Sequence, residues 1–173
     1  ANLYDGTGDV EAIYNERIEE KVLDIESGKY AEIAAISFNV DREPSVKISP
    51  DPAGISSARK RDKIYLIKGT DGDYTGVILR IKGQGLWNLM WAFLALEKDG
   101  NTVIGLKYYK QGETPGLGAE VENPKWFNQW VGNKVYDSSF KPSVAVVKAR
   151  SPKGSEASKY EVDALSGATI TSI

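Results

Sequence analysis

The sequence predicts an α+β domain with a mostly antiparallel sheet and flanking helices. Segments with strand character predominate, and the helical segments are segregated from them instead of alternating with them, which is typical of the α+β class. The turn sequence Lys98-Asp99-Gly100-Asn101 lies between two apolar segments and predicts an antiparallel hairpin. A chain of 173 residues has the length of one domain with a substantial core, so we expect residues 1–173 to form a single domain.

The first element is predicted to be an amphipathic helix over residues 10–25. Asp9 is a suitable N-cap residue, and Gly28 follows the last turn. Apolar residues recur three or four positions apart, at Val10, Tyr14, Ile18, Val22 and Ile25. We therefore expect one face of this helix to pack against the rest of the domain.

The next segments predict strands joined by a long loop. Residues 32–40, 63–68 and 74–82 have the apolar character of strands. Residues 43–58 are rich in Pro, Ser and Asp, so we interpret them as a surface loop and not as a linker between domains.

The apolar segment 86–96 suits either a buried strand or a helix. We interpret it as a strand because it runs directly into the turn at 98–101. Residues 92–97 and 103–109 are then expected to pair as a hairpin.

The last elements are a short helix and a strand. Asn123-Pro124 predicts an N-cap followed by proline at the first helical position, and Gly132 marks the end of this helix. Its aromatic residues share one face: Trp126, Phe127 and Trp130. Residues 144–147 predict a late strand.

The composition excludes several classes of function. A formal net charge of −2 argues against nucleic-acid binding, which depends on neutralising phosphates. The chain has no cysteine and no histidine, so it cannot form disulfides, ligate an iron–sulfur cluster through cysteine or use thiol catalysis. Haem and zinc ligation are not expected either. We therefore predict neither a catalytic residue nor a metal site.

Two short strings stand out. Residues 163–171 read DALSGATIT, where Ser166 is a suitable helix N-cap and Thr169 would be the third helical residue. A phosphate on Thr169 would then meet free backbone N–H groups and the positive end of a helix dipole. Residues 113–118 read ETPGLG, where proline and two glycines predict a rigid turn whose backbone can approach a ligand closely.

Both strings resemble motifs of the FMN-binding domain family. There, the pattern Asp-x-x-Ser/Thr-Gly-Ala-Thr/Ser-x-Thr marks the site where a flavin transferase links the FMN phosphate to a threonine hydroxyl. The resemblance implies that this threonine is Thr169 and that Asp163 is a recognition element for the transferase. It further implies contacts to FMN from three groups of residues: Ser166, Gly167, Ala168 and Thr171 around the phosphate; Glu113, Thr114, Pro115, Gly116, Leu117 and Gly118 along the flavin; and Leu86 with Trp87.

A third region narrows this resemblance. Residues 83–97 and 118–126 resemble the C subunits of sodium-translocating NADH:quinone oxidoreductases. The resemblance implies an electron-carrying subunit of a respiratory complex coupled to sodium translocation, with the other subunits and the flavin transferase as partners. It also implies a bacterial inner-membrane location with this domain on the periplasmic side, and an N-terminal membrane helix, which we expect to have been removed here.

Two alternatives stay open at this point. The G subunit of the Rnf electron-transport complex shares both strings, so the chain could carry FMN in that complex. A domain that assembles a membrane complex without a cofactor is the alternative from a different class.

Overall fold

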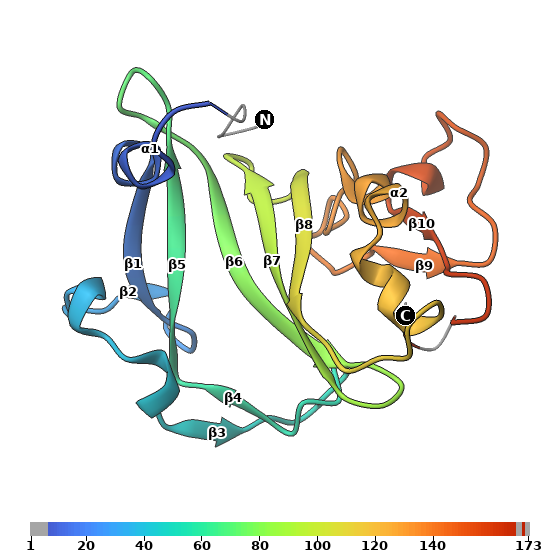
Figure 1. Cartoon of the computed structure of the whole chain (residues 1–173), viewed down its shortest axis with the longest axis horizontal. Helices are drawn as coiled ribbons and strands as arrows, with labels where there is room; N and C mark the ends of the chain where they lie inside the picture. Colours follow the sequence, from blue (N-terminus) through green and yellow to red (C-terminus); the bar gives the residue numbers. More distant parts are fainter. Residues whose placement is uncertain (1–6, 169–170, 172–173) are drawn as a thin grey trace.

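A curved six-stranded sheet forms the centre of the molecule (Figure 1). The computed structural model describes residues 7–168 and 171. The strand order is β2-β1-β5-β6-β7-β8, and every neighbouring pair is antiparallel. The strands are β1 (Ile18–Asp24), β2 (Lys29–Tyr30), β5 (Arg61–Lys68), β6 (Tyr74–Gln84), β7 (Leu89–Glu97) and β8 (Val103–Lys110). The predicted α+β class with a mostly antiparallel sheet is therefore confirmed.

The helix predicted over 10–25 is wrong in its second half. Helix α1 (Val10–Arg17) begins at the expected N-cap, where the Asp9 carboxylate accepts a hydrogen bond of 2.9 Å from the backbone N–H of Glu11. The chain then extends as β1, which pairs with β5 along its whole length and leaves Val22 only 1% exposed. Residues four apart share a face in a helix and also in a strand, so their spacing could not separate the two. Pairing with β5 decided the conformation.

The strand predicted over 32–40 is also wrong. That segment instead contains the 3₁₀ turn η1 (Ala35–Ser37) and leads into η2 (Val40–Arg42). Phe38 and Val40 pack with Val22 in a small second core, so their apolar character reflects burial rather than strand pairing. The loop predicted over 43–58 holds a short antiparallel pair, β3 (Ser45–Lys47) and β4 (Ser57–Arg59), which lies across one end of the sheet in Figure 1.

The predicted strands at 63–68 and 74–82 and the hairpin at 92–109 are confirmed. The interpretation of 86–96 as a strand is correct from Leu89 onward. In the hairpin turn, the Asp99 carboxylate accepts from the backbone N–H groups of Asn101 (2.8 Å) and Thr102 (2.7 Å). These bonds, together with one from the Thr102 hydroxyl, hold the pKa of Asp99 well below its ordinary value.

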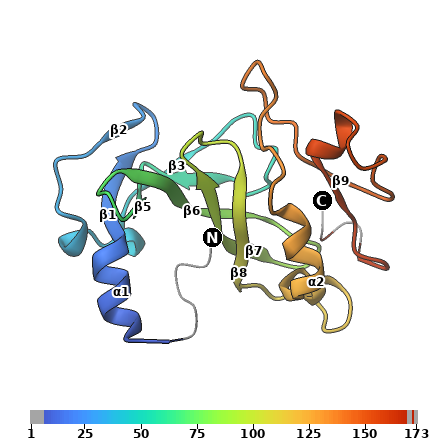
Figure 2. The same cartoon turned by 90° about the horizontal axis from the view of Figure 1, so that it is seen from above.

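Short helices and a parallel strand pair cover one side of the sheet beside β8 (Figures 1 and 2). They are η3 (Gly118–Glu122), α2 (Pro124–Phe127), η4 (Asn128–Trp130), β9 (Ala145–Val147), η5 (Ala157–Lys159) and β10 (Glu161–Asp163). The expected Asn123 N-cap is present, accepting from the backbone N–H of Lys125, and the helix is only shorter than predicted. Strand β10 was not predicted.

The main core lies between these helices and the sheet. Its buried members are Met90, Ala92, Leu106, Val121, Trp126 and Val162. The Trp126 indole N–H donates to the backbone carbonyl of Asp163 at 2.8 Å. This bond connects α2 to the first residue of the segment 163–171. Among the residues that the structure describes, no helix has the length and apolar content to cross a bilayer.

Candidate functional site

The Glu113 carboxylate joins three segments that are far apart in the sequence. This side chain is 6% exposed, at the start of the 113–118 loop that follows β8. Its Oε2 accepts a hydrogen bond of 2.6 Å from the hydroxyl of Thr171, which is itself 3% exposed. Its Oε1 accepts from the backbone N–H groups of Trp87 (3.0 Å) and Asn88 (3.3 Å). One buried acceptor therefore holds the β6–β7 loop and the C-terminal string against the 113–118 loop.

Two glycines leave the space that this carboxylate occupies. A Cβ on Gly85 would lie 2.6 Å from Glu113 Oε1. A Cβ on Gly118 would lie 2.7 Å from Glu113 Oε2 and 2.8 Å from the Thr171 Oγ1. Neither position can take a side chain without moving the hydrogen-bonded group. Gly85 was not among the predicted site residues.

The hydrogen bonds to Glu113 favour its ionised form. Burial acts to raise the pKa of this carboxyl group. The bonds from the Thr171 hydroxyl and from the backbone N–H groups of Trp87, Asn88 and Leu86 outweigh burial and hold the pKa below its ordinary value. The site therefore contains a buried negative charge that hydrogen-bond donors stabilise, and no ion pair to it occurs among residues 7–168 and 171.

Most of the 113–118 loop lies at the surface. Thr114, Pro115, Gly116 and Leu117 are exposed, whereas Gly118 is buried at the start of η3. The carbonyl of Thr114 accepts from the N–H groups of Leu117 (3.1 Å) and Ala119 (3.2 Å), which closes the turn. Gly116 has φ +76°, a conformation that glycine adopts without strain.

The C-terminal string contains a tight turn at residues 165–168. The N–H of Ala168 donates to the carbonyl of Leu165 at 3.1 Å, and Gly167 has φ +75°. That conformation is not helical, so the expectation that the helix starts directly after a Ser166 N-cap is wrong. Ser166 is exposed and Ala168 is buried. Thr169 lies outside the described residues.

The turn at Gly167 lies directly against the 113–118 loop. A Cβ on Gly167 would lie 3.3 Å from Leu117 Cδ2. Thr171 is helical and directs its hydroxyl to Glu113. The structure thus brings residues from all three predicted groups together around Glu113.

Apolar side chains surround this junction but stay exposed. Leu117 is 45% exposed, Leu86 is 47% exposed and Trp87 is 64% exposed. A tryptophan is normally among the more buried residues, so the exposure of Trp87 is unusual for a core role. The three side chains offer an apolar surface to a planar ligand.

A cavity of about 160 Å³ lies beside Thr171, and the sequence did not predict it. Tyr108, Trp130 and Gln84 line it together with Met90. Burial raises the pKa of Tyr108 to about 12, so its hydroxyl stays protonated. The indole N–H of Trp130 is buried and has no hydrogen-bond partner within the described part of the chain. No set of three or more side chains suited to a metal ion occurs in that part.

Asp163, the first residue of the C-terminal string, is partly buried. Its carboxylate accepts from the backbone N–H of Arg150 at 2.9 Å, and its own N–H donates to the Gln129 side chain at 3.2 Å. These contacts connect Asp163 to neighbouring loops and not to the surface around Leu117.

Comparison with known proteins gives a consistent result. A sequence model described as the FMN-binding domain matches residues 85–173. The C subunit of the Na(+)-translocating NADH-quinone reductase of Vibrio parahaemolyticus is 44% identical over 174 residues, covering 94% of this chain and 65% of that protein. The corresponding protein from Neisseria meningitidis is 42% identical over 179 residues, covering 99% of this chain and 68% of that protein. The chain thus spans about two thirds of the length of these relatives.

Two solved structures share the fold. Shewanella oneidensis NqrC matches with a TM-score of 0.87 at 28% identity, covering 96% of this chain and 78% of that chain. The C subunit of the Na(+)-translocating NADH-quinone reductase of Parabacteroides distasonis matches with a TM-score of 0.68 at 34% identity, covering 94% of this chain and 72% of that chain.

Proposed function

Because the chain belongs to the FMN-binding domain family and is homologous over nearly its whole length to the C subunits, we propose that it carries FMN covalently on Thr169. The bond is a phosphoester between the threonine oxygen and the FMN phosphate, made by a flavin transferase. In this transfer the Thr169 oxygen bonds to the FMN phosphorus of FAD, the hydroxyl proton leaves and AMP is released. An unactivated threonine is a weak nucleophile, so the activating base belongs to the transferase.

One observation carries the proposal: the Glu113 carboxylate binds the β6–β7 loop and Thr171 at the same time. Thr171 lies two residues after Thr169, so this contact holds the acceptor segment against the 113–118 loop. A group attached to Thr169 is thereby confined to the neighbourhood of Leu86, Trp87 and Leu117.

The residues around this junction fit a flavin. An isoalloxazine ring needs apolar surface on its faces, and Leu86, Trp87 and Leu117 expose such surface without filling it. Gly116 and Gly167 carry no side chain, and both are exposed, which leaves their backbone accessible to a ligand. When bound, FMN supplies the redox chemistry that the side chains lack.

The chain itself supplies position and environment. The Glu113 carboxylate fixes the loops, and its negative charge contributes to the electrostatic environment of the site. The Leu117 side chain lies against the Gly167 turn. No histidine or cysteine is required for this role, in agreement with a chain that contains neither.

We further propose that the domain relays electrons within a membrane NADH-quinone reductase coupled to sodium translocation. The names of the relatives support this role. Its partners are then the other subunits of that complex, with the domain on the periplasmic side of a bacterial inner membrane.

The test uses the full-length protein assembled in its complex in membranes. Thr169→Val removes the acceptor hydroxyl at similar volume, and Thr70→Val makes the same change at an exposed threonine elsewhere. We expect Thr169→Val complexes to assemble but to lose NADH-dependent quinone reduction, with Thr70→Val unaffected. Unchanged quinone reduction in assembled Thr169→Val complexes would contradict the proposal.

A further inference from the structure

A second cavity lies away from Glu113, between the sheet and the β3–β4 pair. Its volume is about 340 Å³, at the lower end of the roughly 300–1,000 Å³ typical of small-molecule sites. Residues of β5, β6, β7 and β8 form its floor, and Ile55, Ala58 and Arg59 close it from the β3–β4 segment.

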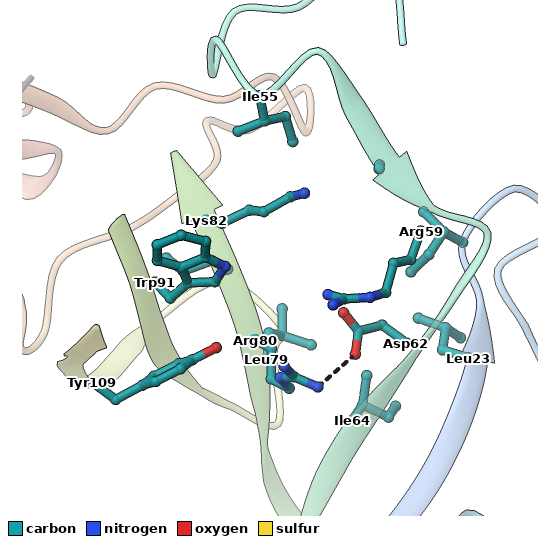
Figure 3. Close-up of a pocket in the computed structure, with 13 residues that line it drawn as sticks. Leu23, Ile55, Arg59, Asp62, Ile64, Leu79, Arg80, Lys82, Trp91 and Tyr109 are labelled. Carbon is teal, nitrogen blue, oxygen red and sulfur yellow. Dashed lines mark hydrogen bonds and ion pairs between the residues drawn. The ribbon is translucent and has the colours of Figure 1, made fainter. Parts of the chain in front are cut away.

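The walls of this cavity are apolar and aromatic. Figure 3 shows Trp91 and Tyr109 on one side and Leu23 and Ile64 on the other. Lining side chains that remain unusually exposed for apolar residues are Ile25 (50%), Ile81 (37%) and Tyr109 (43%). Trp91 lies opposite Lys82 in the β6–β7 register, so an aromatic ring and a cation are neighbours on the same face.

The polar groups of the cavity carry an excess of positive charge. Arg59, Arg80 and Lys82 extend into the space in Figure 3, and Asp62 is the one carboxylate among the lining residues. Asp62 pairs with Arg80 at 3.3 Å. A further cation, Lys110, lies 4.6 Å from the centroid of the Trp91 ring.

The cationic side chains of the cavity retain N–H donors for a ligand. Arg59 contacts Asp41, a carboxylate outside the cavity whose side chain is 88% exposed, so water competes for that pair. Lys82 donates to the carbonyl of Ser57 at 3.1 Å and has three donors in all. The Arg59 and Arg80 side chains are only 24% and 20% exposed, so water does not fully solvate their charges.

We propose that this cavity binds a small aromatic carboxylate, with its ring against Trp91 and its anionic group between Arg59 and Lys82. An apolar cavity with a few convergent polar groups is the usual form of a small-molecule site. Charge complementarity selects the anion, because a neutral ligand of the same shape would offer no charged acceptor to the remaining donors of Arg59 and Lys82.

The test titrates the chain with 2-naphthoate and, separately, with the neutral 2-naphthamide. The four tryptophan indole N–H signals are followed by NMR, with Trp91 assigned through Trp91→Phe. We expect 2-naphthoate to shift the Trp91 signal saturably, and 2-naphthamide to bind about tenfold more weakly, the order expected for losing one charge-assisted hydrogen bond.

Matched variants locate the anion. Arg59→Met should weaken 2-naphthoate binding about tenfold. Arg42→Met, the same change at an exposed arginine outside the cavity, should leave it unchanged. Lys82→Met repeats the test should Arg59→Met fail to fold. Equal binding of acid and amide, a saturable shift confined to other tryptophans, or unchanged affinity in a folded Arg59→Met or Lys82→Met variant would overturn the proposal.

Discussion

Removing the Glu113 carboxylate should destabilise the domain by about 3 kcal/mol. The Thr171 hydroxyl and the backbone N–H groups of Trp87 and Asn88 lose their acceptor in Glu113→Ala. A buried donor left without a partner costs about 1–3 kcal/mol, and the lower end applies here because water can enter the space left by the side chain. Glu113→Gln keeps the shape and one oxygen, so it should cost only about 1 kcal/mol.

The measurement is urea unfolding of the purified domain, analysed by linear extrapolation. Glu122→Ala is the matched control because Glu122 is an exposed carboxylate in the adjoining η3 segment. We expect this control to lie within about 0.5 kcal/mol of wild type. A Glu113→Ala variant as stable as the Glu122→Ala control would refute the assignment of Glu113 as the residue that joins the three segments.

The effect should also depend on pH. The pKa of Glu113 is lowered in the folded state, so its contribution to stability is fully present above its ordinary value of 4.5. That contribution is lost as pH falls through the lower folded-state value. The stability difference between wild type and Glu113→Gln should therefore shrink as pH is lowered below 4.5. A difference that grows over this range would contradict a lowered pKa of Glu113 in the folded state.

Two further predictions concern glycines. Gly118→Ala should cost about 1–3 kcal/mol through overpacking against Glu113 and Thr171, whereas Gly105→Ala, whose added Cβ has no atom within 4 Å, should be nearly neutral in the same unfolding assay. Equal stability of these two variants would count against the tight packing around Glu113. Gly116→Val puts a branched side chain at φ +76°, so it should distort the loop and change the absorbance or potential of the flavin while covalent loading continues. Unchanged spectra and potential in a folded, loaded variant would show that this loop does not face the flavin.

The sequence predicted elements best where local and long-range signals agreed. The Asp99-Gly100 turn and the apolar segments beside it point to the same hairpin, and the structure contains it. The segment after Arg17 was misassigned because Ile18 and Val22 fit a helical and a strand period equally. Only the pairing of β1 with β5 settles the choice, and that contact is invisible in the local sequence.

The candidate site, too, could be predicted from the sequence only where local signals were enough. The strings around Gly116 and Gly167 identified the segments that meet, since glycines and prolines mark close backbone approach. They did not reveal that the Glu113 side chain turns inward, because its partner Thr171 is 58 residues away. The cavity lined by Arg59 and Trp91 was missed for the same reason: its walls come from strands and a hairpin that are distant in the sequence.

The most direct test of covalent attachment is the intact mass of the denatured chain after co-expression with a flavin transferase. We predict an increase equal to one FMN less one water, located by fragmentation to Thr169. Thr70→Val provides the matched control, because it makes the same change at an exposed threonine outside the motif. It should still gain the same mass, while Thr169→Val should gain none. An unmodified wild-type chain, or a modified Thr169→Val chain, would contradict covalent attachment at this residue.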